Sequence, residues 1–78
     1  MRVVTLIIIH CSAVLPWHQS GFHEIDTWHL QRGFKYGCGY HKIIRRDGTI
    51  EDGRPYEMIG AHCQHRNQHS IGIVYEGS

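Results

Sequence analysis

The chain has 78 residues, a formal net charge of +1, 41% hydrophobic residues and 19% charged residues. These values indicate one folded domain with little core to spare, and they exclude a disordered chain. The charge lacks the basic excess that attracts nucleic acid or an anionic membrane surface, so neither is an expected partner.

The first predicted element is a strand at residues 3–9, VVTLIII, whose β-branched apolar run is typical of a central strand covered on both faces. The run is too short to span a membrane. It is also followed by His10, Cys11 and Ser12, which do not form a signal-peptide cleavage site. We therefore expect a mature strand, with neither an export signal nor a membrane span.

A loop at residues 15–21 precedes a predicted helix at about residues 22–32, which ends at Gly33. Asp47 and Gly48 then indicate a tight hairpin between two short strands, and the apolar run at residues 71–75 predicts a last strand. The order predicts an α/β fold with a mixed central β-sheet and flanking helices.

One helix covers only one face of such a sheet. We therefore expect residues 1–78 to be a single domain whose second sheet face needs cover, either from a partner or from more chain. The exposed apolar face also predicts self-association through the uncovered sheet.

Eight histidines and three cysteines raise the question of metal binding. The odd number of cysteines argues against a disulfide scaffold and favours a chain made in the cytoplasm. His10 ends the first strand, where a side chain can face a crevice and serve as one of the three protein ligands of a catalytic zinc ion. The alternative is a histidine that is simply hydrogen-bonded at a sheet edge.

Tyr40 is expected to begin a strand and to present its phenol to the same crevice, where it could donate a hydrogen bond to an oxyanion. An ordinary half-buried strand tyrosine is the alternative, and His62, which follows Gly60 and Ala61, has the same ambiguity. Cys11 is expected to be a small buried side chain.

The spacing of other cysteines and histidines allows a structural zinc knuckle, although neither half has the C-x-x-C spacing that is typical of one. Its ligands would be Cys38, His41, Cys63 and His65. The histidines expected on solvated surfaces are His18, His23, His29, His65 and His69.

Five blocks occur in one order along nearly the whole chain: IIIHCSA, IDTWHLQRGF, GYHKIIRRDGTIEDGRP, GAHC and NQHSIGIVYEG. Together they resemble the zinc-dependent N-acetylmuramoyl-L-alanine amidases of the phage endolysin type, which are related to peptidoglycan recognition proteins. The resemblance implies a peptidoglycan hydrolase that uses zinc-activated water to cleave the amide between N-acetylmuramic acid and L-alanine of the stem peptide.

Residue by residue, the resemblance implies that His10 is a zinc ligand and Tyr40 the catalytic tyrosine. It also implies that His62 and Asn67 line the substrate groove. A separate branch of the family has a glutamate at the position of Val74, so this chain resembles the tyrosine branch. Val14 departs from the threonine usual after HCSA.

The family's other two zinc ligands, an assisting lysine and the helices that cover the sheet lie beyond the position of Ser78. The resemblance therefore implies that residues 1–78 are a single, truncated domain without its C-terminal helical cover and that they are inactive alone. It also implies a product made in the cytoplasm of a phage-infected or prophage-carrying cell that acts on the bacterial cell wall. The rival functions are a non-catalytic peptidoglycan-binding module and the small structural zinc protein described above.

Overall fold

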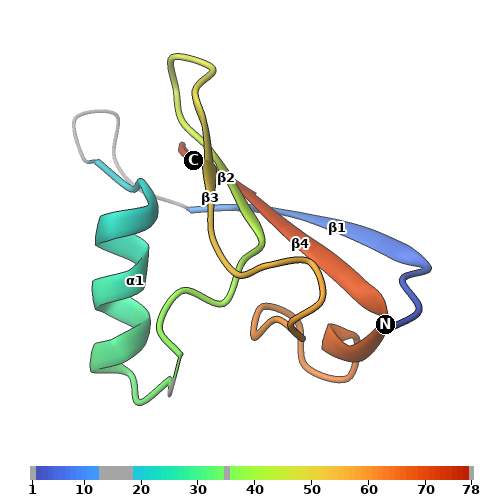
Figure 1. The fold of residues 1–78 in the computed structure, drawn as a ribbon. Helices are drawn as coiled ribbons and strands as arrows, with labels where there is room; N and C mark the ends of the chain where they lie inside the picture. Colours follow the sequence, from blue (N-terminus) through green and yellow to red (C-terminus); the bar gives the residue numbers. More distant parts are fainter. Residues whose placement is uncertain (1, 13–18, 35, 78) are drawn as a thin grey trace.

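The computed structural model describes residues 2–12, 19–34 and 36–77. Its elements in chain order are β1 (Leu6–Cys11), α1 (Phe22–Gln31), β2 (Lys42–Ile44), β3 (Ile50–Asp52), the 3-10 helix η1 (Asn67–His69) and β4 (Ser70–Tyr75). In Figure 1, α1 stands on one side of the sheet, and β1 and β4 extend side by side away from it. The predicted α/β fold with a mixed sheet is confirmed.

The four strands form one sheet in the order β1-β4-β2-β3. The last strand in the sequence, β4, lies in the centre and pairs in parallel with both β1 and β2, while β2 and β3 pair antiparallel. The prediction that the first strand is central was therefore wrong. In the described part of the chain, β1 lies at an edge, and strand order cannot be read from the apolar content of one strand.

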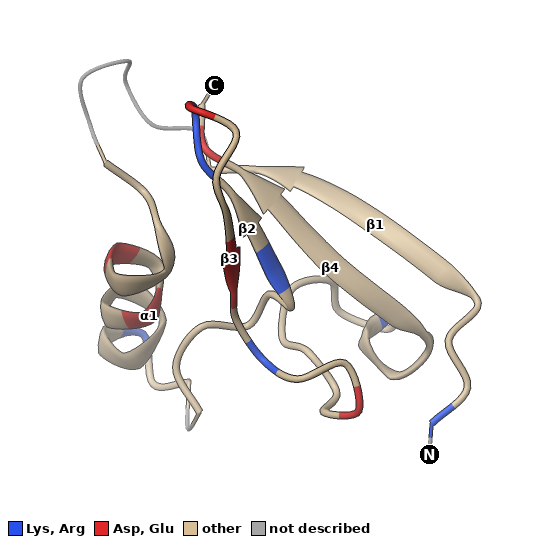
Figure 2. Cartoon of the chain, turned by 45° about the horizontal axis from the view of Figure 1, so that its top comes forward, with Lys and Arg blue, Asp and Glu red and all other residues tan. Residues whose placement is uncertain are grey.

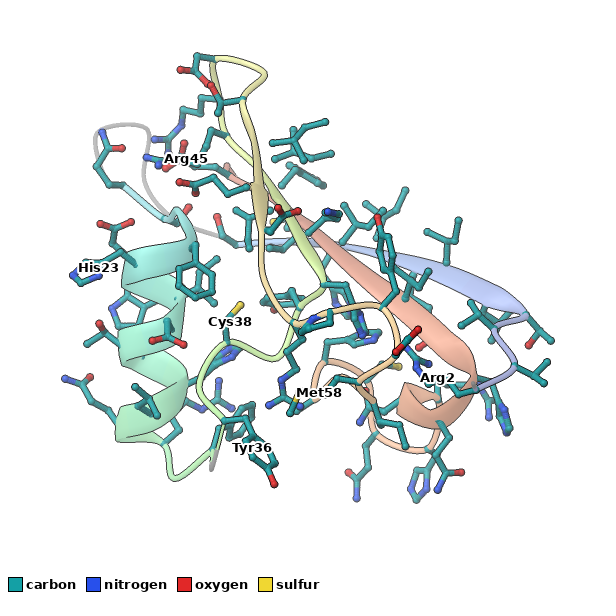
Figure 3. All side chains as sticks on the ribbon, viewed as in Figure 1. Arg2, His23, Tyr36, Cys38, Arg45 and Met58 are labelled. Carbon is teal, nitrogen blue, oxygen red and sulfur yellow. The ribbon has the colours of Figure 1, made fainter. Side chains whose placement is uncertain are left out.

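The two faces of the sheet differ in their cover. In register, His10 pairs with Val74 and Val74 with Ile43, so these side chains share one face. This face carries the core, in which Ile25 of α1 packs with Val74, Ile43 and the buried Cys38. Figure 3 shows Cys38 between α1 and the sheet.

The opposite face carries apolar side chains that remain exposed. Ile7 is 65% exposed and Ile9 67% exposed, and Tyr75 of the central strand is 42% exposed. Figure 2 shows β1 and β4 without charged residues, so the part of this face that these two strands form is uncharged. Lys42 of β2 lies on the same face, in register with Ile73. The expectation that helical cover reaches only one face of the sheet agrees with this arrangement.

Helix α1 begins and ends within one residue of its predicted range. The Glu24 carboxylate accepts a hydrogen bond of 2.9 Å from the backbone N–H of Gly21, which stabilises the first turn. At the other end, Gly33 adopts a φ of +91°, a left-handed conformation that terminates a helix and that glycine adopts without strain.

The predicted hairpin is confirmed between β2 and β3, where Ile44 pairs with Ile50. Its turn places Gly48 at a φ of +91°, and the Asp47 carboxylate accepts the Thr49 N–H at 2.9 Å. Both features explain why Asp47 followed by Gly48 indicates a tight hairpin turn in the sequence.

Glu76 joins the end of β4 to two distant segments. Its carboxylate accepts the backbone N–H of Ser20 at 2.5 Å and that of Arg46 at 3.0 Å, and it also accepts Nε of Arg45 at 3.1 Å. Burial alone would raise the pKa of Glu76, but these hydrogen bonds outweigh it and lower the pKa to about 2. In Figure 2 the charged segments gather where the hairpin tip approaches the C-terminal end.

The predicted loop at residues 15–21 falls largely outside the described residues, as do Val14 and His18. Within the described ranges, no helix has the length and apolar character needed to cross a membrane.

Candidate active site

His10 lies near the end of β1 and points to the covered face of the sheet. Its imidazole Nε2 lies 2.9 Å from Nδ1 of His62, a hydrogen bond in which one ring donates to the other. Burial lowers the pKa of His10. The ring is therefore neutral near pH 7, and it has one basic nitrogen that can act as a metal ligand or accept a proton.

His62 is held by three neighbours. Its Nδ1 faces His10, and its Nε2 lies 3.2 Å from Oγ of Ser70. The ring lies so close to Gly72 of β4 that a Cβ there would stand 2.5 Å from two ring carbons. Burial and the neighbouring His10 lower the pKa of His62 to about 4, so this ring is also neutral near pH 7.

Asn67 fixes the loop that carries His62. Its side-chain Oδ1 accepts the backbone N–H of His62 at 3.0 Å and that of Cys63 at 2.8 Å. Asn67 stands at the start of η1, directly before β4. It therefore connects the position of the His62 backbone to the sheet, besides lining the cavity described below.

Tyr40 lies two residues before β2, so it precedes the strand that it was predicted to begin. Its ring centroid is 5.3 Å from that of His10, 5.5 Å from that of His29 and 6.2 Å from that of His62. Burial raises the pKa of Tyr40. The phenol is therefore protonated near pH 7 and can donate a hydrogen bond.

A cavity of about 470 Å³ opens beside these rings. Its lining residues are His29, Arg32, Phe34, Tyr40, Ala61, His62, Cys63, Gln64 and Asn67. The structure thus brings His10, Tyr40 and His62 together, and it places Tyr40, His62 and Asn67 on one cavity wall.

His29 was expected on a solvated surface, and this prediction was wrong because only 7% of the residue is exposed. Its Nδ1 accepts the backbone N–H of Gly39 at 2.8 Å, and its ring packs beside Tyr40. A sequence signal existed, because His29 follows the buried Ile25 by four residues and therefore shares its helix face. His23, His65 and His69 are exposed as expected, and Cys11 is half-buried.

The zinc knuckle is not formed. In the described part of the chain, which includes all four of its proposed ligands, no three His, Cys, Asp or Glu side chains converge on one point. His41 is instead committed to the protein: its Nδ1 accepts the Gly72 N–H at 3.0 Å, and its Nε2 donates to the Met58 carbonyl at 2.7 Å. These bonds place His41 in a structural role beneath the site.

The chain belongs to the N-acetylmuramoyl-L-alanine amidase family, Amidase_2, whose sequence profile matches residues 1–78. The resemblance drawn from the five sequence blocks is thereby confirmed.

Particular relatives support the same assignment. The endolysin of Escherichia phage T7 is 44% identical over 71 residues, which are 91% of this chain and 46% of the relative. Peptidoglycan-recognition protein SC1a of Drosophila melanogaster is 31% identical over 68 residues, which are 87% of this chain and 33% of the relative.

Among solved structures, the N-acetylmuramoyl-L-alanine amidase LysC from Clostridium intestinale URNW superposes with a TM-score of 0.89 at 36% identity. The superposition covers 99% of this chain and 49% of LysC. This chain therefore spans about half the length of the phage relatives and of the solved amidase that it matches.

Proposed function

We propose that this chain forms the His10–Tyr40 half of an N-acetylmuramoyl-L-alanine amidase active site. The reaction is hydrolysis of the amide between N-acetylmuramic acid and L-alanine of the peptidoglycan stem peptide. The observation that carries the proposal is the convergence of His10, Tyr40 and His62 beside one cavity in a chain of this family. The proposed place of action is the bacterial cell wall, after synthesis in the cytoplasm.

The donor chemistry of His10 fits zinc, because a neutral imidazole nitrogen is a preferred zinc ligand. A catalytic zinc ion needs three protein ligands, and the described residues do not bring three together. We therefore propose that His10 supplies one ligand and that the 78 residues alone bind zinc weakly and hydrolyse no amide. When bound, zinc lowers the pKa of a water molecule and polarises the scissile carbonyl.

Tyr40 is proposed to donate its phenolic proton in a hydrogen bond to the carbonyl oxygen as negative charge develops there. A protonated phenol suits this role, and the raised pKa of Tyr40 keeps it protonated through neutral pH. His62 would orient the His10 ring through the bond between their nitrogens, as outer partners of metal-binding histidines do. Asn67 would keep the His62 loop, and with it one wall of the groove, in place.

A second candidate is a peptidoglycan-binding module without catalysis. It is favoured by the similarity to a peptidoglycan-recognition protein and by the lack of a three-ligand set within the described residues. Both candidates bind muropeptide, so only hydrolysis separates them.

The test uses a hybrid endolysin, in which the 71 matched residues of the Escherichia phage T7 endolysin are replaced by those of this chain. Loss of an oxyanion donor typically costs about 100- to 1,000-fold in rate, so Tyr40→Phe should lower turnover by that factor with zinc content unchanged. His10→Ala should lose both zinc and activity. Tyr75→Phe, on the exposed sheet face, is the matched control.

Near-normal turnover of the Tyr40→Phe hybrid would remove Tyr40 from the mechanism. A hybrid that binds muropeptide and contains zinc but hydrolyses nothing would favour the binding module.

A further inference from the structure

The cavity beside Tyr40 has an uneven distribution of charge. Among the described residues that line it, Arg32 is the one that is charged near pH 7, and none is an aspartate or a glutamate. The rest of the wall consists of neutral rings and polar groups, including the amides of Gln64 and Asn67. A positive, acid-free cavity favours an anionic ligand over a neutral or cationic one.

Arg32 is held toward this cavity by local structure. It directly follows the last residue of α1, and its backbone N–H still bonds to the Trp28 carbonyl at 3.1 Å. Its guanidinium carbon lies 5.5 Å from the centroid of the Phe34 ring, which lines the same cavity. A guanidinium placed on an aromatic face keeps its N–H groups directed outward, where they can form a paired hydrogen bond with a carboxylate.

No described carboxylate forms an ion pair with Arg32; the described ion pairs involve Lys42, Arg45 and Arg46. The charge of Arg32 nevertheless acts on His29, another residue of the cavity wall. Burial lowers the pKa of His29, and the positive charges of Arg32 and Arg54 lower it further. A ligand carboxylate would therefore meet an uncompensated positive charge.

A smaller cavity of about 130 Å³ shares His29, Arg32 and Tyr40 with the larger one. Arg32 thus lies on the wall common to both, on the same wall as the proposed catalytic tyrosine. A ligand that presents its scissile amide to Tyr40 would place its next peptide residue within the same hollow.

We propose that Arg32 binds a free carboxylate of the stem-peptide residue that follows L-alanine, and so selects stem peptides with a carboxylate there over those with a carboxamide. This inference rests on the proposed function, and it adds a specificity residue to it. Arg32 acts in binding and positioning of the substrate, and it takes no part in the bond cleavage.

The test measures binding of two probes by the 78-residue chain, using isothermal titration calorimetry at low ionic strength. The probes are N-acetylmuramoyl-L-alanyl-D-glutamate and N-acetylmuramoyl-L-alanyl-D-isoglutamine. They differ only at the α-carboxyl group of the residue after L-alanine, which is a carboxylate in the first probe and a carboxamide in the second. An exposed ion pair is worth up to about 1 kcal/mol, so we expect roughly 5-fold tighter binding of the carboxylate probe. Arg32→Gln should abolish the difference, and Arg32→Lys should retain part of it.

Arg66→Gln is the matched control, because it removes the same charge from an exposed arginine that does not line the cavity. It should leave the preference intact. Equal binding of both probes by the unaltered chain, or a preference that survives Arg32→Gln, would overturn the assignment of Arg32 while leaving muropeptide binding in place. Failure to bind either probe would overturn the proposed function as well.

Discussion

The close approach of His62 to Gly72 yields a quantitative prediction for Gly72→Ala. A Cβ at this position would stand 2.5 Å from the ring, whereas ordinary contact begins at about 3.4 Å, so the ring must retreat by about 0.9 Å. That shift breaks the ring's hydrogen bonds to His10 and Ser70, which contribute about 1 kcal/mol each. Replacing a strand glycine recovers about 0.5–1 kcal/mol. We therefore expect Gly72→Ala to lower the free energy of unfolding by about 1–1.5 kcal/mol.

Urea denaturation of the 78-residue chain measures this loss, and a double-mutant cycle assigns its cause. In a His62→Ala background the added methyl group meets no ring, so Gly72→Ala should then be neutral or slightly stabilising. An equal penalty in both backgrounds would refute the view that Gly72 is there to accommodate the His62 ring.

Three further predictions concern stability and assembly. Glu76→Gln should lower the free energy of unfolding by about 2 kcal/mol in denaturation experiments, because it removes a buried carboxylate that accepts several hydrogen bonds. Glu57→Gln, on the surface, is the control and should not change it measurably. Light scattering at micromolar concentrations should detect dimers or larger species. Ile9→Lys on the exposed sheet face should dissociate them, and Leu30→Lys on α1 should not. A strictly monomeric chain would contradict self-association through the exposed sheet face. Because the fold lowers the pKa of His62 from 6.5 to about 4, the unfolded chain binds a proton in this interval that the folded chain does not. Stability should therefore be full above pH 6.5 and fall toward pH 4 by roughly 1 kcal/mol for this partly exposed ring, and greater stability at pH 5 than at pH 7 would contradict it.

Local signals in the sequence predicted the helix and the hairpin well. Gly33 terminates α1, and the Asp47–Gly48 turn defines β2 and β3, because each of these features depends on a few adjacent residues. Strand order could not be predicted in this way. The pairing of β4 with both β1 and β2 joins residues that are far apart in the sequence, and the apolar run of β1 did not reveal that it lies at an edge.

The candidate site shows the same difference between local features, which the sequence predicts, and long-range contacts, which it does not. His10 was a candidate from its position at a strand end, but its role as a zinc ligand, like the roles of Tyr40 and His62, was assigned through the family resemblance and stays a prediction. Their mutual approach depends on the loop that Asn67 holds by its two hydrogen bonds, and no spacing rule encodes that loop conformation. The burial of His29 was missed, although its helix position relative to Ile25 carried the signal.

The most direct test of the proposed amidase function identifies the bond that is cut. The hybrid endolysin is incubated with purified peptidoglycan in H₂¹⁸O, and the products are analysed by mass spectrometry. We predict stem peptides with a free L-alanine amino terminus, glycan strands that remain intact, and ¹⁸O in the newly formed lactyl carboxylate, all abolished by His10→Ala. Cleavage within the glycan or between amino acids of the peptide, or amidase products that persist after His10→Ala, would contradict the proposed function.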